Sequence, residues 1–209
     1  MRKVDHEGRR QEVAAAAARL IAREGLDALT TRALAKELGC SIGVLSHYFN
    51  SKVDIVNAAF QWADQRIDDR VQEAMAGSEL SFDVFIPIVR ATLPLDKDAE
   101  LEWRVRFNLY TYAFTDDELR NTQREKLQNF KTLMCQLVEQ LQAKGELRND
   151  LSPTLLTRAV FDITMGAALN LLRLPLDERA EEGAYLFEML DSLKPERASL
   201  QAVKKQATA

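Results

Sequence analysis

The stretch TTRALAKELGCSIGVLSHYFNSK, residues 30–52, contains the signals that decide the fold of this chain. Threonines precede a first apolar segment, Gly39 follows it, and Ser41 precedes a second segment that reaches Phe49. Threonine and serine cap helix starts, and glycine ends helices because it adopts the left-handed backbone conformation without strain. The pattern predicts a helix, a tight turn and a very short second helix ending near Phe49. That is the helix-turn-helix arrangement, whose second helix enters the DNA major groove.

The second helix of this stretch is predicted to have an inner and an outer face. Val44, Leu45 and Phe49 can turn inward and pack on Leu34 and Leu38. The residues left outside are suited to a polyanion, because hydroxyls, ring N–H groups and ammonium groups are common phosphate ligands. We expect the outer residues to be Ile42, Gly43, Ser46 and His47, with Tyr48 at the rim.

Two features at the ends of this helix support contact with DNA. Gly43 has no Cβ, so the helix start could approach a base edge or a phosphate closely. Lys52 stands in the first turn of the next helix, where its charge opposes the helix dipole. A cation at that position is reasonable if a phosphate lies beside it. Exposure without function is the alternative for His47, and no nucleophile at a plausible spacing supports catalysis by this side chain.

The whole chain is predicted to be all-α. It has 209 residues, 46% of them hydrophobic, with only eight glycines and five prolines. Alanine, leucine, glutamate, glutamine and arginine outnumber the β-branched residues, which favours helix throughout. We expect helices over residues 7–23, 30–38, 41–49, 52–75, 82–93, 98–114, 116–144, 153–174 and 177–193.

Charge is distributed unevenly along the sequence. Residues 1–52 contain nine Lys or Arg and six Asp or Glu, whereas residues 53–209 contain nineteen and twenty-six. The N-terminal segment therefore has a net charge of +3 and the remainder −7. A basic end on an acidic body indicates that this end meets a polyanion, although chance clustering of solvated charge gives the same numbers.

Cysteine usage and hydropathy indicate a cytoplasmic protein without a membrane partner. Cys40 and Cys135 lie far apart and show no metal-ligand spacing. The N-terminal sequence MRKVDHEGRRQEV lacks the apolar stretch of a signal peptide. No run approaches the roughly eighteen apolar residues that span a bilayer. We expect no metal, no cofactor and no catalytic residue.

Residues 9–56 resemble the DNA-binding signature of the TetR family of transcriptional regulators. Ala35, Gly39, Ser41, Tyr48-Phe49 and Ser51-Lys52 all fall in register with that signature. The family usually has tyrosine where this chain has Ser46. The resulting motif SHYF is similar to the corresponding motif of the choline-responsive BetI-type repressors. The segment WRVRF, residues 103–107, is similar to a segment of their ligand domain.

The resemblance implies a dimeric regulator whose C-terminal domain binds a small molecule that releases DNA. It implies that Thr31, Ser46, His47, Tyr48 and Lys52 hold phosphates. It also implies that Ile42, Gly43 and either Val44 or His47 touch bases. Ser41, at the start of the same helix, belongs to the predicted DNA-binding set.

The candidate effector residues lie in the C-terminal part. Trp103, Phe107, Tyr110 and Phe114 recur at helical spacing and form an aromatic stripe, which could be plain core or a binding wall. Further candidates are Met134, Phe161, Met165 and Asn170. Arg104 and Arg106 flank the stripe, and we expect both to point outward into water. A neutral or anionic hydrophobic effector is favoured over a quaternary ammonium ion.

The segment 153–174 is apolar nearly all round, so it must be covered on two sides. We expect one cover to be its own domain and the other to be a second copy of the chain, with Gly166 allowing close approach. Leu186, Met189, Leu190 and Leu193 are expected to join this interface. The alternative is the central helix of a monomeric bundle.

These observations predict three regions and one function. Residues 1–52 form a helix-turn-helix domain, residues 53–193 a ligand-binding and dimerisation bundle, and residues 194–209 a flexible tail. The function is that of a homodimeric repressor that binds a near-palindromic operator on double-stranded DNA and is released by a small-molecule effector. An activator or a nucleoid-like DNA binder is possible within the same class. The alternative from another class is a helical ligand carrier or enzyme with purely structural N-terminal helices.

Overall fold

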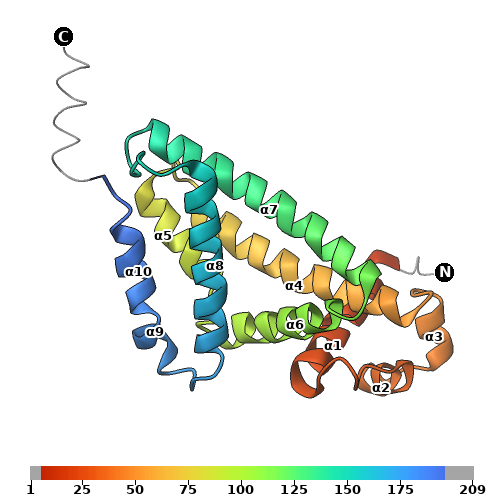
Figure 1. Ribbon diagram of the computed structural model, residues 1–209. Helices are drawn as coiled ribbons and strands as arrows, with labels where there is room; N and C mark the ends of the chain where they lie inside the picture. Colours follow the sequence, from red (N-terminus) through yellow and green to blue (C-terminus); the bar gives the residue numbers. More distant parts are fainter. Residues whose placement is uncertain (1–5, 196–209) are drawn as a thin grey trace, which may run out of the picture. The chain divides into compact units, whose positions relative to one another are not determined.

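The computed structural model describes residues 6–195, and every regular element in that range is an α-helix, which confirms the predicted all-α class. In chain order the helices are α1 (His6–Glu24), α2 (Thr31–Glu37), α3 (Ile42–Ser46), α4 (Lys52–Met75), α5 (Phe82–Ala91), α6 (Lys97–Ala113), α7 (Asp117–Ala143), α8 (Pro153–Leu171), α9 (Arg179–Glu182) and α10 (Ala184–Asp191) (Figure 1). None of these helices combines the length and the apolar character that a bilayer-spanning segment requires.

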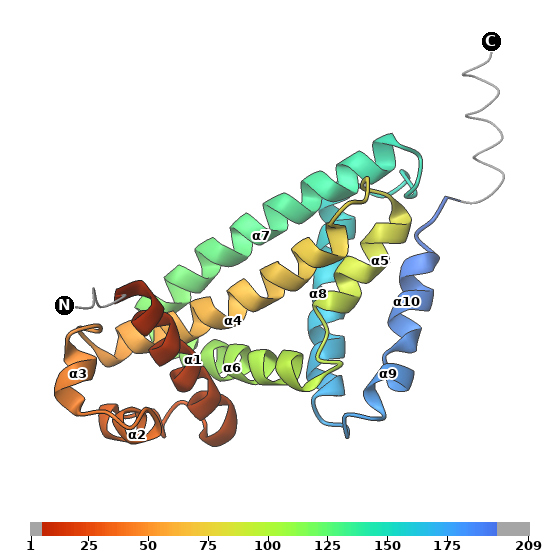
Figure 2. The ribbon, with the colours of Figure 1, turned by 180° about the vertical axis from the view of Figure 1, so that it is seen from behind.

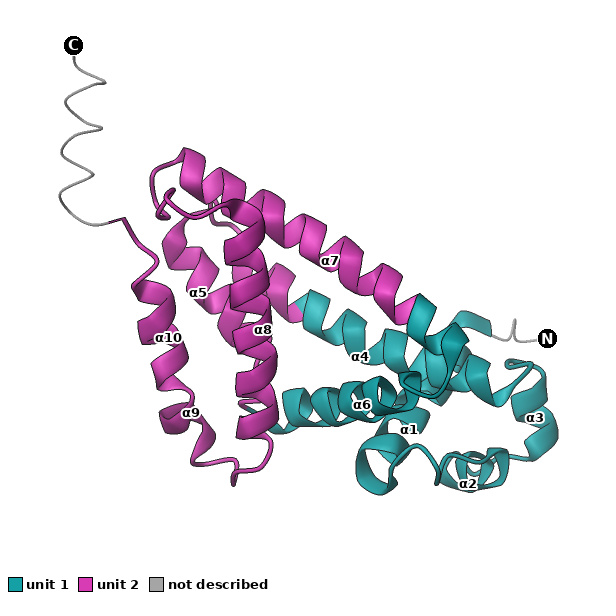
Figure 3. Cartoon of the chain, in the orientation of Figure 1, with its two compact units in different colours: residues 1–69, 96–121 teal, residues 70–95, 122–209 magenta. Residues whose placement is uncertain are grey.

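The chain divides into two compact units (Figure 3). Unit 1 comprises residues 1–69 and 96–121, and unit 2 comprises residues 70–95 and 122–209. Unit 1 therefore contains α6 and most of α4 in addition to the predicted DNA-binding segment, whereas the sequence suggested a division after residue 52. The functional division into residues 1–52, 53–193 and 194–209 remains a prediction, and residues 196–209 of the tail lie outside the described part.

Unit 1 is organised around the apolar faces of its helices. α1 packs along α6 and against α2, and α2 packs against α3 (Figure 2). Leu20 from α1, Leu34 from α2, Leu45 from α3 and Leu109 from α6 are all buried in one cluster. α2 and α3, at seven and five residues, are too short to be stable alone, so burial in this cluster stabilises them.

Several predicted helices extend two or three residues beyond the observed ends, and one predicted helix is divided in two. α3 ends at Ser46, and a turn rather than helix leads to Phe49. The helix expected over residues 177–193 is two helices, α9 and α10, joined at Gly183. The backbone ψ of Gly183 is −7°, far from the roughly −42° of an α-helix. A Cβ at this position would come within 3.0 Å of the Arg179 carbonyl oxygen and 3.4 Å of Leu171 Cδ1, so the lack of a side chain favours glycine at the junction.

Unit 2 contains a buried cation that the sequence did not single out. Arg179 is 3% exposed, and its guanidinium donates hydrogen bonds to the carbonyl oxygens of Pro94 and Leu174, each at 3.1 Å. These carbonyl groups follow α5 and α8 respectively. Arg179 therefore joins the ends of two helices to α9. Its buried Nε, Nη1 and Nη2 groups all donate to neutral backbone carbonyl oxygens.

Candidate functional site

The turn between α2 and α3 has the geometry that the sequence predicts. Thr30 Oγ1 accepts a hydrogen bond from the Ala33 N–H at 3.0 Å and caps the start of α2. After α2, Gly39 has φ +61°, and its N–H donates to Lys36 O. The next N–H, of Cys40, donates to Ala35 O at 2.9 Å. These two bonds with a left-handed glycine make a Schellman motif, in which a residue with a Cβ would be strained.

The inner face of α3 confirms the predicted orientation. Leu45 and Phe49 are 2% and 5% exposed and belong to the same buried cluster as Leu34. Leu38 and Val44 are half-buried. Burial of these side chains fixes which side of α3 faces away from the protein, because residues three and four apart share one helix face.

The outer face of α3 is exposed. Ile42 is 47% exposed, which is unusual for so large an apolar side chain but suits contact with a thymine methyl group in the major groove. Tyr48 is half-buried at the edge of this face. The other predicted DNA-binding residues with exposed side chains or backbone are Thr31, Ser41, Gly43, Ser46, His47 and Lys52.

Two serines of α3 differ from their expected behaviour. Ser41 occupies the N-cap position with extended backbone, but its side chain makes no cap hydrogen bond. Its hydroxyl is therefore not engaged by the α3 backbone. Ser46 Oγ donates to Gly43 O at 2.9 Å, so its one proton is used within α3. Ser46 must rotate before it can donate to a phosphate.

Cations near α3 fall into paired and unpaired groups. Arg9 pairs with Glu12, whose hydrogen bond and charge raise the pKa of the guanidinium, and Arg23 pairs with Glu24 and Glu37. Within residues 6–195, by contrast, Arg32, Lys36 and Lys52 are exposed and have no carboxylate partner. Unpaired cations on α2 and at the start of α4 flank α3, where a phosphate backbone would pass. The sequence interpretation missed Arg32 and Lys36, which charge and helical position alone could have suggested.

A second feature missed in the sequence lies in α1. The side chain of Arg10 and the ring of His6 both contact the residues that follow α3, at Tyr48 and Phe49. The spacing of four between His6 and Arg10, which places both on one face of α1, was the available signal.

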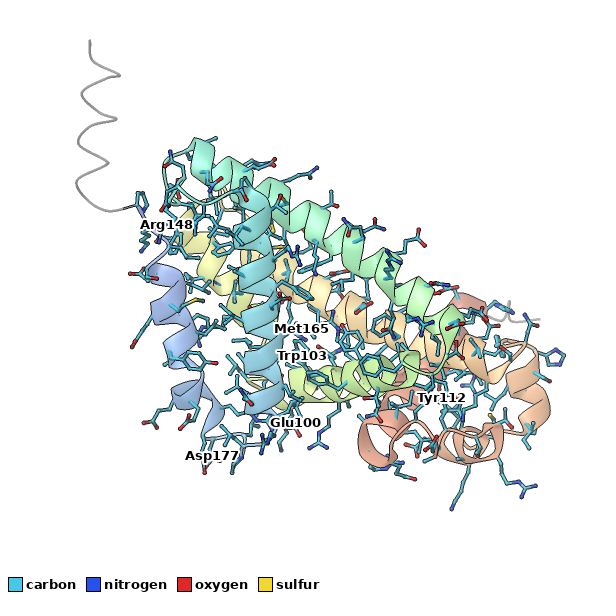
Figure 4. The ribbon with its side chains drawn as sticks, in the orientation of Figure 1. Glu100, Trp103, Tyr112, Arg148, Met165 and Asp177 are labelled. Carbon is cyan, nitrogen blue, oxygen red and sulfur yellow. The ribbon has the colours of Figure 1, made fainter. Side chains whose placement is uncertain are left out.

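The aromatic stripe of α6 is partly core and partly surface. Trp103, labelled on α6 in Figure 4, is the buried member. It is 1% exposed, whereas Phe107 and Tyr110 are half-buried and Phe114 is 78% exposed. The ring centroids of Trp103 and Phe107 are 5.3 Å apart, and those of Phe107 and Tyr110 are 6.2 Å apart. Phe60 of α4 continues the cluster at 6.5 Å from Tyr110. The structure therefore brings three of the predicted effector residues together within unit 1.

The two arginines of this segment point in different directions. Arg104 is exposed and pairs with Glu100 on the same helix, as expected. Arg106 was expected to point outward, but it is half-buried, with Nε 3.3 Å from Asp64 Oδ1 of α4. Its guanidinium lies 5.1 Å from the centroid of the Trp103 ring. A counterion and a ring face offset the loss of hydration, and the sequence alone does not show that Asp64 is near.

The remaining effector candidates belong to unit 2. Met134, Phe161 and Met165 are half-buried, whereas Asn170 is exposed on α8. The Phe161 ring lies 6.0 Å from that of Phe130 on α7. Asn170 thus belongs to the open face of α8 rather than to a buried apolar environment. In residues 6–195 no cluster of three His, Cys, Asp or Glu side chains is arranged to hold a metal ion.

The open face of α8 carries apolar residues. Leu155, Ile163 and Leu169 are 52%, 37% and 50% exposed, and Gly166 lies among them. On α10, Tyr185 is 52% exposed. Of the four apolar residues expected at an interface near the end of the chain, Leu186 and Leu190 are 0% exposed, because α10 packs them against its own unit, whereas Met189 and Leu193 are half-buried.

The two parts of the chain match two family models. The model of bacterial regulatory proteins of the tetR family matches residues 13–59, and the C-terminal model of BetI-type transcriptional repressors matches residues 87–193. The HTH-type transcriptional regulator PksA of Bacillus subtilis (strain 168) is 24% identical over 177 residues, which cover 84% of this chain and 86% of PksA.

Solved structures of similar fold come from several bacteria. A transcriptional regulator from Saccharomonospora viridis, crystallised with choline, has a TM-score of 0.80 at 20% identity and covers 91% of this chain and 100% of its own. A TetR-family regulator from Rhodococcus sp. has a TM-score of 0.78 at 18% identity and covers 90% and 100%. The family consists of transcriptional regulators, which sets aside the alternative of a helical carrier or enzyme. The chain therefore belongs to the TetR family and is a DNA-binding transcriptional regulator.

Proposed function

We propose that this regulator is a repressor that binds a near-palindromic operator as a homodimer and leaves it when a small-molecule effector binds. The observation that carries the proposal is the exposed outer face of α3, flanked by the unpaired cations Arg32, Lys36 and Lys52. Nuclease protection of the promoter region beside its own gene tests it. We expect two protected half-sites, about 34–36 Å or a multiple apart, since each α3 of a dimer reads one half-site. Protection of DNA without sequence preference would contradict the proposal.

The proposed contacts divide between backbone and bases. Thr31, His47, Tyr48 and Lys52 hold phosphates and set the register of the protein on the duplex, with Ser46 joining them after rotation. Ile42 and Gly43 face the base edges, so their replacement alters sequence preference.

Lys52→Ala is expected to weaken binding to every DNA sequence and to reduce the salt slope of log K by about one, because one phosphate contact is lost. The measurement is a gel-shift titration of the protected promoter fragment at several salt concentrations. Lys97→Ala is the matched control, since Lys97 is also an exposed lysine at the start of a helix. An unchanged slope for Lys52→Ala would remove Lys52 from the phosphate ligands.

We propose that two copies associate through the open face of α8. Exposed Leu155, Ile163 and Leu169 lie on one side of this helix, and Gly166 presents no side chain there. Burying such a face against its symmetric copy removes apolar surface from water at roughly 25 cal/mol per Å². A two-fold axis also explains a near-palindromic operator, because protein and DNA then share the same symmetry.

We propose that the effector contacts the aromatic cluster of α6, and that it is neutral or anionic and hydrophobic. Arg106 already places its guanidinium over the Trp103 ring, so a cationic effector has to compete with this internal cation. An anionic group on the effector could instead form an ion pair with the Arg106 guanidinium by displacing Asp64 from it. A quaternary ammonium effector is the second candidate, supported by the BetI-type match and by the choline bound to the Saccharomonospora viridis regulator. The alternative proposed contacts, all within unit 2, are Met134, Phe161 and Met165.

Phe107→Ala is expected to abolish the thermal shift that an effector gives to the wild-type protein. The measurement is a thermal-shift screen of choline-like cations, fatty and aromatic acids, and neutral aromatics. Hits are then tested for release of the promoter fragment. Phe114→Ala, at the 78% exposed end of the stripe, is the control and should keep the shift. A hit that stabilises wild type and Phe107→Ala equally, and leaves the DNA complex intact, would rule out this cluster as the sensor.

A further inference from the structure

α3 depends on other elements for its orientation. It spans only Ile42–Ser46, and a helix of five residues has little stability of its own. At its start, Ser41 provides no side-chain cap. Leu45 and, just beyond the helix, Phe49 pack it onto the buried cluster of unit 1, but apolar contacts are not directional. A directional contact is needed to fix where Tyr48 and the outer face lie.

Arg10 supplies such a contact at the other end of α3. Its Nη1 donates a hydrogen bond to the carbonyl oxygen of Tyr48, a residue 38 positions later in the chain. The carbon at the centre of its guanidinium lies 4.4 Å from the centroid of the Phe49 ring. The first turns of α1 therefore lie beside the end of α3 (Figures 1 and 2). The Arg10 guanidinium therefore does two things: it donates to the Tyr48 carbonyl just beyond the end of α3, and it covers the buried Phe49 ring.

His6 makes a second contact with the same segment, from the same face of α1. Its ring centroid lies 4.7 Å from that of Tyr48, with the ring planes inclined at 46°. Tyr48 is therefore held at its backbone carbonyl by Arg10 and at its ring by His6. Within residues 6–195, Arg10 has no carboxylate within 4.0 Å, unlike its neighbour Arg9. Its partners are thus a neutral carbonyl and an aromatic ring rather than a counterion.

We infer that Arg10 is a positioning residue for DNA binding. It holds the segment that follows α3 in place, so that Tyr48 and the outer face of α3 contact the operator together. The inference rests on the proposed role of α3 at the operator. Arg10 acts through Tyr48 and Phe49 and does not itself bind a phosphate. A lysine at this position keeps the charge, but its ammonium has a single donor nitrogen, which cannot lie flat over the ring or present the planar fork of N–H groups of a guanidinium.

The test compares Arg10→Lys and Arg10→Gln with wild type on two DNA duplexes. One carries the protected promoter sequence and the other has the same composition in scrambled order. For Arg10→Lys we expect operator affinity to fall on the order of tenfold, while affinity for scrambled DNA and the salt slope stay unchanged, because no charge is lost. Arg10→Gln should lose at least as much operator affinity. His6→Ala should lose less, because it removes only the ring contact.

Arg19→Gln is the matched control, since Arg19 is an exposed arginine of the same helix. Circular dichroism establishes that each variant is folded at the temperature of the assay, and Arg10→Lys retains most of the native packing should Arg10→Gln unfold. Operator affinity within twofold of wild type for folded Arg10→Lys and Arg10→Gln would overturn the inference. Full binding by Arg10→Lys, with a slope lowered by about one in Arg10→Gln, would overturn it too and make Arg10 a phosphate ligand. If the wild-type protein protects no promoter sequence, it is instead the proposed operator function that fails.

Discussion

The double substitution Leu155→Glu with Leu169→Glu is expected to convert the proposed dimer into monomers that no longer hold the operator. Both side chains are exposed on the open face of α8, so the charges should be tolerated within one chain. In a symmetric dimer each charge would be buried twice, at several kcal/mol per unpaired ion. Sedimentation equilibrium should then give the 23.7 kDa of one chain rather than twice that mass. Operator affinity should fall on the order of 100-fold or more, because the second half-site is no longer bound intramolecularly.

A charge on another helix is the control that locates the interface. Leu133→Glu introduces the same charge at a leucine of α7 that is 55% exposed, and we expect it to remain dimeric. Monomers from Leu133→Glu and dimers from the α8 variant would move the interface to α7. Charged substitutions at Ala167 on α8 and Leu190 on α10 are unsuitable for this test, because these residues are 2% and 0% exposed within their own chain. Charges at those positions would unfold the chain before they could separate the subunits.

Trp103→Ala is expected to cost about 3–5 kcal/mol of folding free energy, the largest loss from any single aromatic residue of α6. The side chain is 1% exposed, so its removal leaves a cavity that close-packed neighbours fill only in part. The midpoint of thermal unfolding, followed by far-ultraviolet circular dichroism, should drop by roughly 6–20 °C for a chain of this size. Arg106 also loses the ring face it covers, which adds to the destabilisation.

Tyr112→Ala is the matched control on the same helix. Tyr112 is 38% exposed, and its truncation should change the free energy of unfolding by about 0.5 kcal/mol or less. A similar loss from both substitutions would mean that the burial of Trp103 does not determine its contribution. A small loss from Trp103→Ala alone, with effector response gone, would instead assign Trp103 to effector contact rather than to the fold.

The N-terminal helices were predictable because their signals are local. Thr30 caps α2, Gly39 has the left-handed φ, and Ser51 Oγ accepts the Asp54 N–H at 3.0 Å to cap α4. Each of these features depends on residues within about four positions of one another, which a sequence shows directly. The apolar spacing also indicated that Leu45 and Phe49, four residues apart, share the inner face of this segment, which leaves Ile42 outside.

The C-terminal part was less predictable because its patterns allow more than one packing. α8 is apolar nearly all round, so its sequence cannot say that Ala167 is covered by its own chain while Leu169 is exposed. On α10 the apolar stripe suggested a subunit interface, yet Leu186 and Leu190 are buried within one chain. A periodic stripe shows that a face is covered, but it does not show by what.

The sequence by itself determined the all-α class, the helix-turn-helix and the residues that line its outer face. Caps, glycines and helical periodicity act over one or two turns of the same segment, so they carry that information without knowledge of the fold. Only the tertiary structure decided that Arg106 turns toward Asp64 and that Arg10 holds the carbonyl of Tyr48. Both contacts join segments that are distant in the chain, and a cation turns inward only where another segment brings an acceptor, a counterion or a ring face to it.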